Sequence, residues 1–123
     1  MLPFMLLMTK AVFIRLTAYE KAQVQAIHAY IMANLHTPLE AASLALAFGI
    51  SPYKLQAGLV QAYGQRFADH VKAARMQRAS ELLLGTNQII YAIARACGYR
   101  NESSFTRAFR QWYGCPLDAY RKR

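Results

Sequence analysis

One pattern of small, turn-forming and apolar residues occurs twice in this chain, 49 to 50 residues apart. In the first copy, Ala45 and Gly49 are followed by the apolar pair Leu55 and Leu59 and then by Gly64. The second copy has the same kinds of residue at Ala94, Gly98, Phe105, Phe109 and Gly114. The alanine permits a close helix crossing, the glycine permits positive φ at a turn, and the apolar pair seats a second helix. The pattern predicts two helix-turn-helix units, whose turns differ slightly because the second copy has one extra residue before its first aromatic residue.

The rest of the chain is consistent with a small helical protein. Its 123 residues, 55% of them hydrophobic, can bury one modest core or two small lobes. From about residue 18 the apolar spacing is helical to the end. We expect an all-α fold of about seven helices, with two homeodomain-like helix-turn-helix subdomains joined by a long linker helix. The predicted divisions are an N-terminal arm or remnant of a lost sensor domain (1–17), a first lobe (18–64), a linker helix (65–85) and a second lobe (86–123).

Two helices are predicted before the first turn. An apolar stripe indicates a first helix from about residue 18 to residue 36. The stripe consists of Ala22, Ile27, Tyr30, Ile31 and Leu35. Thr37, Pro38 and Glu40 have the spacing of a capping box with proline at the first helical position, so a second helix should begin here and end at Gly49.

Ser51 and Pro52 repeat the cap and the proline, which predicts a third helix through Tyr63. Leu55 and Leu59 should face inward. The second helix of a DNA-binding helix-turn-helix unit lies in the major groove of DNA, so the outer faces of this helix are the candidate contact surface. Five residues should lie there and form the first DNA-contacting set, with Ser51 as a phosphate contact: Tyr53, Lys54, Gln56, Ala57 and Gln61. In a major groove, glutamine can bind adenine through two hydrogen bonds, alanine can contact the thymine methyl, and lysine can neutralise a phosphate.

A linker helix is predicted from about residue 66 to residue 84. Roughly 20 residues at 1.5 Å each give about 30 Å, close to the ~34 Å of one DNA turn, so two recognition helices could reach successive major-groove segments. Arg75 falls near the apolar stripe of this helix and is either a phosphate contact or a partly buried structural residue.

The second unit should have a positioning helix followed by a recognition helix from Asn101, its cap, to Tyr113. The expected inward residues are Ile89, Ile90, Ile93, Ala94 and Cys97, then Phe105, Phe109 and Trp112. The second DNA-contacting set is Asn101, Glu102, Ser103, Thr106 and Arg107, with Arg100 and Arg110 as phosphate contacts. Arg107 could bind guanine or a phosphate, whereas Glu102 either complements the helix dipole or accepts from cytosine.

Charge supports a polyanionic partner. The formal net charge is +9, and residues 54–123 carry twelve basic and four acidic side chains against three and two in residues 1–53. Excess positive charge on the repeated units suggests nucleic acid. A basic membrane-surface protein or a merely soluble basic domain would fit the charge but not the duplicated turn.

Other functions find little support in the residues. Cys97 and Cys115 lack metal spacing, and Cys97 should be a packed, reduced thiol, which makes a cytoplasmic location the default. We expect no metal, no cofactor and no catalytic residue, since no nucleophile–base pair or phosphate-binding glycine loop occurs. The N-terminal apolar run is interrupted by Lys10 and lacks a cleavage site, so neither a membrane span nor a signal peptide is expected.

Three stretches resemble the C-terminal DNA-binding domain of the AraC/XylS family of bacterial transcription regulators. They are residues 75–83 (RMQRASELL), 90–99 (IYAIARACGY) and 104–114 (SFTRAFRQWYG), within a similarity that covers about residues 39–121. The resemblance implies sequence-specific binding to double-stranded DNA, recruitment of RNA polymerase, usually activation, and action in the bacterial cytoplasm at the nucleoid.

The chain departs from the family pattern in several places. Ala57 stands where a long polar reader is common, Gly58 replaces a large apolar residue, and Pro116 is one position earlier than the family's proline, where this chain has Leu117. Only about 17 residues precede the first helix, so the chain resembles stand-alone members that bind DNA as monomers, or else a truncated member. The alternative function is a degenerate member that acts as a protein-interaction module on RNA polymerase or another regulator; an enzyme is the third and weakest candidate.

Overall fold

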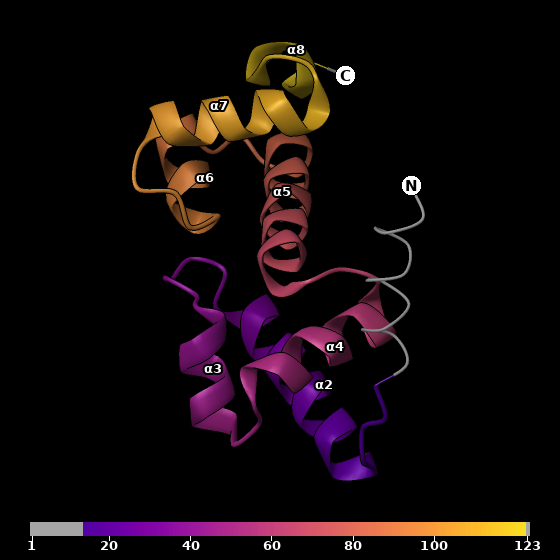
Figure 1. Cartoon of the computed structure of the whole chain (residues 1–123). Coiled ribbons are helices and arrows are strands. Elements are labelled where there is room, and N and C mark those ends of the chain that lie inside the picture. Colours follow the sequence, from indigo (N-terminus) through magenta and orange to yellow (C-terminus); the bar gives the residue numbers. More distant parts are fainter. Residues whose placement is uncertain (1–13, 123) are drawn as a thin grey trace. The chain divides into compact units, whose positions relative to one another are not determined.

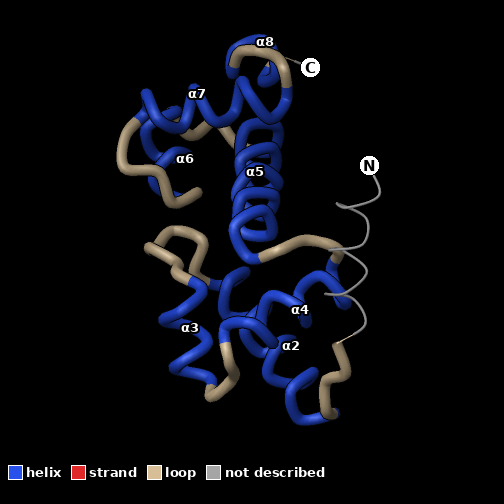
Figure 2. The backbone as a smooth tube through the Cα atoms, viewed as in Figure 1, coloured by secondary structure: helices blue, strands red, loops and turns tan. Residues whose placement is uncertain are grey.

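The computed structural model describes residues 14–122, and within them it contains seven helices and no strand (Figures 1 and 2). The helices are α2 (Ala18–Ala33), α3 (Ala41–Phe48), α4 (Pro52–Tyr63), α5 (Phe67–Gly85), α6 (Ile90–Ala96), α7 (Glu102–Tyr113) and α8 (Leu117–Arg121). The predicted all-α fold with a long central helix is confirmed. Of the N-terminal arm, residues 1–13 lie outside the described part, and residues 14–17 have no regular secondary structure.

The chain divides into two compact units. In the described residues, unit 1 comprises 14–33 and 39–71, and unit 2 comprises 34–38 and 72–122. The first turn of α5 therefore belongs to unit 1 and the rest of this helix to unit 2. The short segment 34–38, which follows α2 in sequence, groups with unit 2.

Unit 1 is built from three mutually packed helices, α2, α3 and α4. Val24, Ile27 and Ile31 of α2 are buried, as are Leu55 and Leu59 of α4. A side chain at Gly58 of α4 would place its Cβ 2.5 Å from Cγ2 of Val24. Gly58 therefore permits the close approach of α4 to α2, which accounts for the departure from a large apolar residue noted in the sequence.

The predicted apolar stripe of the first helix was shifted at two positions. Ala22 and Tyr30 are exposed, and Gln23 and Val24 are buried instead. The amide of Gln23 donates a hydrogen bond to the carbonyl oxygen of Phe48, so this polar residue is accommodated inside the lobe. Because a hydrogen-bonded glutamine can occupy the buried face, hydrophobicity alone misplaced the stripe.

The predicted start of the second helix was wrong. Glu40, not Thr37, is the residue before α3, and it forms no side-chain cap. The hydroxyl of Thr37 instead donates to the carbonyl oxygen of Asn34 at 2.7 Å, and the carbonyl oxygen of Thr37 accepts from Arg75 at 2.8 Å. These contacts hold Thr37 in the connection that follows α2.

The two turns of the repeat share a backbone hydrogen bond, although the second turn is one residue longer, as predicted. The amide of Ile50 donates to the carbonyl oxygen of Ala45 at 3.0 Å, and the amide of Tyr99 donates to that of Ala94 at 2.9 Å. The repeat glycines all have positive φ, as predicted, at Gly49, Gly64, Gly98 and Gly114. The repeat in the sequence is therefore a repeat in backbone structure.

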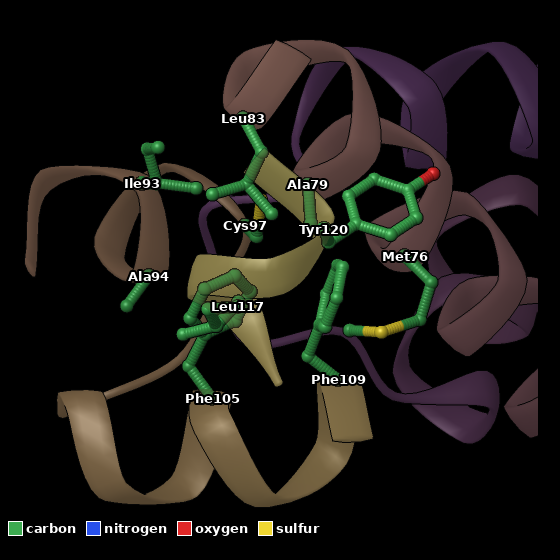
Figure 3. Packing of buried hydrophobic residues seen from close by; sticks show 10 residues of the cluster. All are labelled: Met76, Ala79, Leu83, Ile93, Ala94, Cys97, Phe105, Phe109, Leu117 and Tyr120. Atoms are coloured by element: carbon green, nitrogen blue, oxygen red, sulfur yellow. The ribbon is translucent and has the colours of Figure 1, made fainter. Parts of the chain in front are cut away.

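Unit 2 has a core centred on two phenylalanines of α7 (Figure 3). Phe105 and Phe109 are fully buried, and their rings lie 6.0 Å apart between centroids. The buried residues around them are Met76, Ala79, Leu83, Ile93, Ala94, Cys97, Leu117 and Tyr120. Burial raises the pKa of the Cys97 thiol to about 11, so the predicted packed thiol is protonated near neutral pH.

Two residues predicted for this core lie at its edge. Ile89 is exposed because it precedes α6 in an extended conformation, and Trp112 is 42% exposed although Phe109, three residues earlier, is buried. Tyr113 packs against the core instead, and its hydroxyl donates a hydrogen bond to the carbonyl oxygen of Met76 at 3.0 Å.

Arg75 holds the segment 34–38 against α5. Its guanidinium donates to the carbonyl oxygens of Leu35 at 3.3 Å and Thr37 at 2.8 Å. A Cβ at Gly98 would collide with the carbonyl oxygen of Leu35 and lie 2.8 Å from the Nε of Arg75. Of the two interpretations of Arg75, the structure therefore supports the partly buried structural residue, and burial lowers the pKa of its guanidinium.

Enlarging the small residue at either repeat should destabilise the protein. Ala45 and Ala94 are both fully buried beside their turns. We expect Ala45→Leu and Ala94→Leu each to lower the free energy of unfolding by about 1–3 kcal/mol through overpacking. Thermal and urea unfolding would measure the effect, with Ala42→Leu on the exposed face of α3 as the control. Unchanged stability in both variants would contradict the helix crossing inferred for the repeat.

Three aromatic side chains form a titratable cluster inside unit 1. His28 of α2 stacks on Tyr63 of α4 with centroids 4.2 Å apart, and its Nδ1 lies 2.8 Å from the Nε2 of the buried His70. One imidazole must donate and the other accept, so protonation of both would break this hydrogen bond. Burial, together with the electrostatic interaction with His28, lowers the pKa of His70.

The cluster should make the protein less stable in mild acid. The unfolded chain takes up a proton at His70 near pH ~6.5, before the folded chain does, so stability should fall as pH decreases through this range. The thermal midpoint would be measured between about pH 7.5 and 5.5 for wild type, His70→Gln and the control His36→Gln, whose histidine is exposed. We expect His70→Gln to reduce the pH dependence. An equal reduction in His36→Gln would refute the assignment to His70.

Candidate nucleic-acid interface

The second recognition helix, α7, is fixed at both ends and along one face. The side-chain oxygen of Asn101 accepts a hydrogen bond from the amide of Ser104 at 2.8 Å, as predicted for a cap. Gly114 ends the helix in a left-handed conformation. Since Phe105 and Phe109 anchor the inner face in the core (Figure 3), the orientation of the outer face is set.

The outer face of α7 carries the polar residues predicted from the sequence. The exposed side chains are Glu102, Ser103, Thr106, Arg107 and Arg110. Within residues 14–122, none of these five has a hydrogen-bond or ion-pair partner. Ser103, Arg107 and Arg110 are spaced by four and three residues, which places them on one side of the helix.

This face has the chemistry needed to bind a nucleic acid duplex. An arginine can donate two hydrogen bonds to guanine or to a phosphate, and hydroxyls can bind bases or phosphates. Arg100 is exposed in the turn before Asn101, and Arg110 follows Arg107 along the helix. Glu102 lies in the first helical turn, where its charge also complements the helix dipole.

The first recognition helix, α4, begins as the sequence predicts. The hydroxyl of Ser51 accepts from the amide of Lys54 at 3.1 Å, and Pro52 is the first helical residue. Ser51 and Tyr53 are exposed, Tyr53 to 66%, so a partner can reach both, and the Ser51 hydroxyl can still donate while it accepts from Lys54.

Three of the other predicted contacts on α4 are engaged inside unit 1. The Nζ of Lys54 lies 2.6 Å from the Oε2 of Glu20. The side-chain oxygen of Gln56 accepts from the amide of Phe67 at 2.8 Å, and the side-chain amide of Gln61 donates to the carbonyl oxygen of Ile14. These side chains are half-buried, so an approaching duplex would have to compete with partners already present.

The predicted outward position of Ala57 was wrong. Its side chain is 1% exposed, and the following residues Gly58, Leu59 and Val60 are buried as well. The reason is that α4 packs against both α2 and α3, which buries a wider face than one apolar stripe would indicate. Ala57 therefore has no surface to offer to a thymine methyl.

Glu20 was absent from the residues singled out in the sequence. It lies in the first turn of α2 and forms a capping box with Thr17, whose hydroxyl accepts from the amide of Glu20 at 3.0 Å. The Thr–x–x–Glu spacing signals this cap in the sequence, but the contact with Lys54, 34 residues away, becomes visible only in the fold.

Part of the positive charge is structural. Arg121 of α8 donates to the carbonyl oxygens of Leu83 at 3.2 Å and Thr86 at 2.9 Å, which ties α8 to the end of α5. Together with Arg75, it shows that net charge overstates the number of cations that can meet a polyanion.

The described residues show neither a metal-binding cluster nor a membrane-spanning helix. Residues 14–122 contain no group of three or more histidine, cysteine, aspartate or glutamate side chains placed to hold a metal ion. None of the helices in this range is both long and apolar enough to cross a membrane.

Comparison with known proteins places the chain in the helix-turn-helix class. The family model described as "Helix-turn-helix domain" matches residues 44–123. The uncharacterized HTH-type transcriptional regulator YpdC of Escherichia coli is 30% identical over 94 residues, which cover 76% of this chain and 33% of YpdC. The multiple antibiotic resistance protein MarA of the same organism is 24% identical over 92 residues, covering 75% of this chain and 72% of MarA. The chain thus spans about a third of the length of YpdC and most of MarA.

Solved structures of several regulators have the same fold as this chain. The C-terminal domain of AraT, a response regulator from Geobacillus stearothermophilus, is 30% identical with a TM-score of 0.73, covering 89% of this chain and 88% of that domain. A probable AraC family transcriptional regulator from Rhodopseudomonas palustris is 27% identical with a TM-score of 0.65, over 82% of this chain and 96% of that one. The DNA-binding domain of AdpA, solved in complex with a target DNA, has a similar fold at 21% identity and a TM-score of 0.73, over 80% and 89% of the two chains. The chain belongs to the AraC-type family of helix-turn-helix, DNA-binding transcription regulators.

Proposed function

We propose that this chain binds a specific site in double-stranded DNA mainly through α7 and thereby regulates transcription. The observation that carries the proposal is the outer face of α7, where five exposed polar side chains lack partners among the described residues. The core fixes the opposite face of the helix, so this outer face is presented rigidly. The complex of the similarly folded AdpA domain with DNA supports the choice of ligand.

The roles of the α7 residues follow from their chemistry. Arg107 reads guanine, and Ser103 and Thr106 contact bases or the backbone beside it. Arg100 and Arg110 neutralise phosphates. Asn101 acts chiefly by capping α7, since its side-chain oxygen already accepts from Ser104.

The first lobe contributes less to base recognition. Ser51 and Tyr53 are exposed at the start of α4, but Ala57 is buried, and Gln56 and Gln61 are bound internally. We therefore expect α4 to contact the backbone and to specify few bases. The length of α5, 19 residues or about 28 Å, supports a second contact about one helical turn of DNA away.

The family assignment supports the biological role that we propose. The chain acts as a monomer on DNA in the bacterial cytoplasm, at the nucleoid, and recruits RNA polymerase as an activator. The family assignment and the similar regulators support the regulation of transcription; the monomeric state, the polymerase contact and activation are the finer part of the proposal.

One observation favours the alternative of a protein-interaction module. On α4, the polar side chains of Lys54, Gln56 and Gln61 all have partners within unit 1. If α7 also failed to read bases, a protein surface such as that of RNA polymerase would be the better partner for the chain.

Selection of bound duplexes from a random DNA pool, followed by affinity measurements across salt concentrations, would test the proposal. We expect an enriched site with one well-defined sequence motif, which α7 reads. We also expect the affinity to fall steeply with salt, because binding releases the counterions of the DNA phosphates. A second defined sequence motif, one helical turn of DNA away, would mean that α4 also reads bases. Absence of enrichment would favour the protein-interaction module.

Arg107→Ala should weaken binding to the selected site by about 1–3 kcal/mol and relax preference at one base position. Affinities for the selected site and for random duplexes would be compared by fluorescence anisotropy. Arg95→Ala, on the exposed face of α6, is the control because it removes the same charge. An equal loss of affinity for the selected and the random duplexes would show that Arg107 contacts a phosphate and does not read a base.

A further inference from the structure

The ion pair between Glu20 and Lys54 links two helices of unit 1 at the candidate interface. Lys54 is the only basic residue in the sequence of α4 (Pro52–Tyr63). Its Nζ lies 2.6 Å from the Oε2 of Glu20, on α2. The single cation that α4 could offer to a phosphate is therefore already bound to a carboxylate.

The carboxylate of Glu20 is held in position by a second set of contacts. Its Oε1 accepts from the amide of Thr17 at 2.9 Å, while the amide of Glu20 donates to the hydroxyl of Thr17 at 3.0 Å. The Glu20 side chain is 17% exposed and that of Lys54 is 43% exposed, so the lysine is the more accessible partner. The hydrogen bond from Lys54 and that from the backbone of Thr17 lower the pKa of Glu20, which keeps it ionised near neutral pH.

We propose that Glu20 competes with DNA phosphate for Lys54 and thereby limits the affinity of the first lobe for DNA. A phosphate that approaches the start of α4 must displace Glu20 from Lys54 or accept the repulsion of its negative charge. This inference rests on the proposed function, since it assumes that α4 lies near a DNA backbone. It identifies Glu20, outside the recognition helix, as a residue that tunes binding.

The expected size of the effect is modest. A partly exposed ion pair contributes little, so its removal should change affinity by about two- to fivefold at low salt. A new contact between Lys54 and a phosphate would also make the salt dependence steeper, by about 0.9 in the slope of log affinity against log salt concentration. The slope distinguishes a new phosphate contact from a general change in charge.

Glu20→Gln is the informative variant because glutamine retains the capping box with Thr17 but loses the charge that binds Lys54. Affinity for the selected duplex would be measured from about 50 to 200 mM salt, a range over which phosphate contacts are resolved. Glu40→Gln is the matched control: it makes the same change in net charge at an exposed residue before α3, which has no basic partner among the described residues. We expect tighter binding and a steeper slope for Glu20→Gln than for Glu40→Gln.

The gain should depend on Lys54. In a Lys54→Met background, Glu20→Gln should improve binding no more than Glu40→Gln does. In the wild-type background, Lys54→Met should change the salt slope little, because Glu20 already occupies the lysine. The single variant Lys54→Met also tests the proposal if Glu20→Gln lowers thermal stability. A large decrease in its salt slope would show that Lys54 binds phosphate in the wild type, and it would overturn the proposal.

The outcomes separate this inference from the proposed function. Equal effects of Glu20→Gln and Glu40→Gln, with normal binding by wild type, would overturn the competition alone. Failure of wild type and of Glu20→Gln to bind any duplex would overturn both the competition and the function on which it rests.

Discussion

The rest of the structure depends on a backbone hydrogen bond that occurs in both repeats. In each repeat, the residue after the turn glycine donates to the carbonyl oxygen of an alanine. Ile50 donates to Ala45, and Tyr99 donates to Ala94. The bond closes the end of one helix, and because the alanine is small the next helix can cross close to it. The direction of α4 and α7, and therefore which of their faces is buried, follows from this closure.

Local signals in the sequence predicted the cap and the two core phenylalanines of the second unit, although Ile89 and Trp112 were misplaced. Non-local contacts limited what could be predicted in the first unit. Asn101 caps α7 as expected, and Phe105 and Phe109 are buried at the expected spacing. By contrast, the signal at Thr37 resembled a helix start, but the carbonyl oxygen of that residue accepts from Arg75, 38 residues away. No spacing rule anticipates a contact at that distance in the chain, so the start of α3 was misplaced.

The outer face of α4 was harder to predict for a related reason. A single apolar stripe predicts one buried face, but α4 packs against two helices, and this buries Ala57 as well as Leu55 and Leu59. Small residues such as Ala57 and Gly58 carry almost no hydrophobic signal, although both lie in the interior. The outer face of α7 was easier to predict because Phe105 and Phe109 define the buried side and charged residues the exposed side, although Trp112 was wrongly expected to be buried.

The two copies of the repeat therefore share a backbone and differ in what their polar side chains do. On α7, Arg107 and Arg110 face solvent, whereas on α4, Lys54 and Gln56 are bound to groups of their own lobe. A side chain with an internal partner must exchange one hydrogen bond for another when DNA arrives, so its net contribution to binding is small. A side chain without a protein partner exchanges only its hydrogen bonds with water for hydrogen bonds with DNA. The proposed function therefore assigns different roles to the two lobes: α7 determines the DNA site, and the first lobe adjusts the affinity.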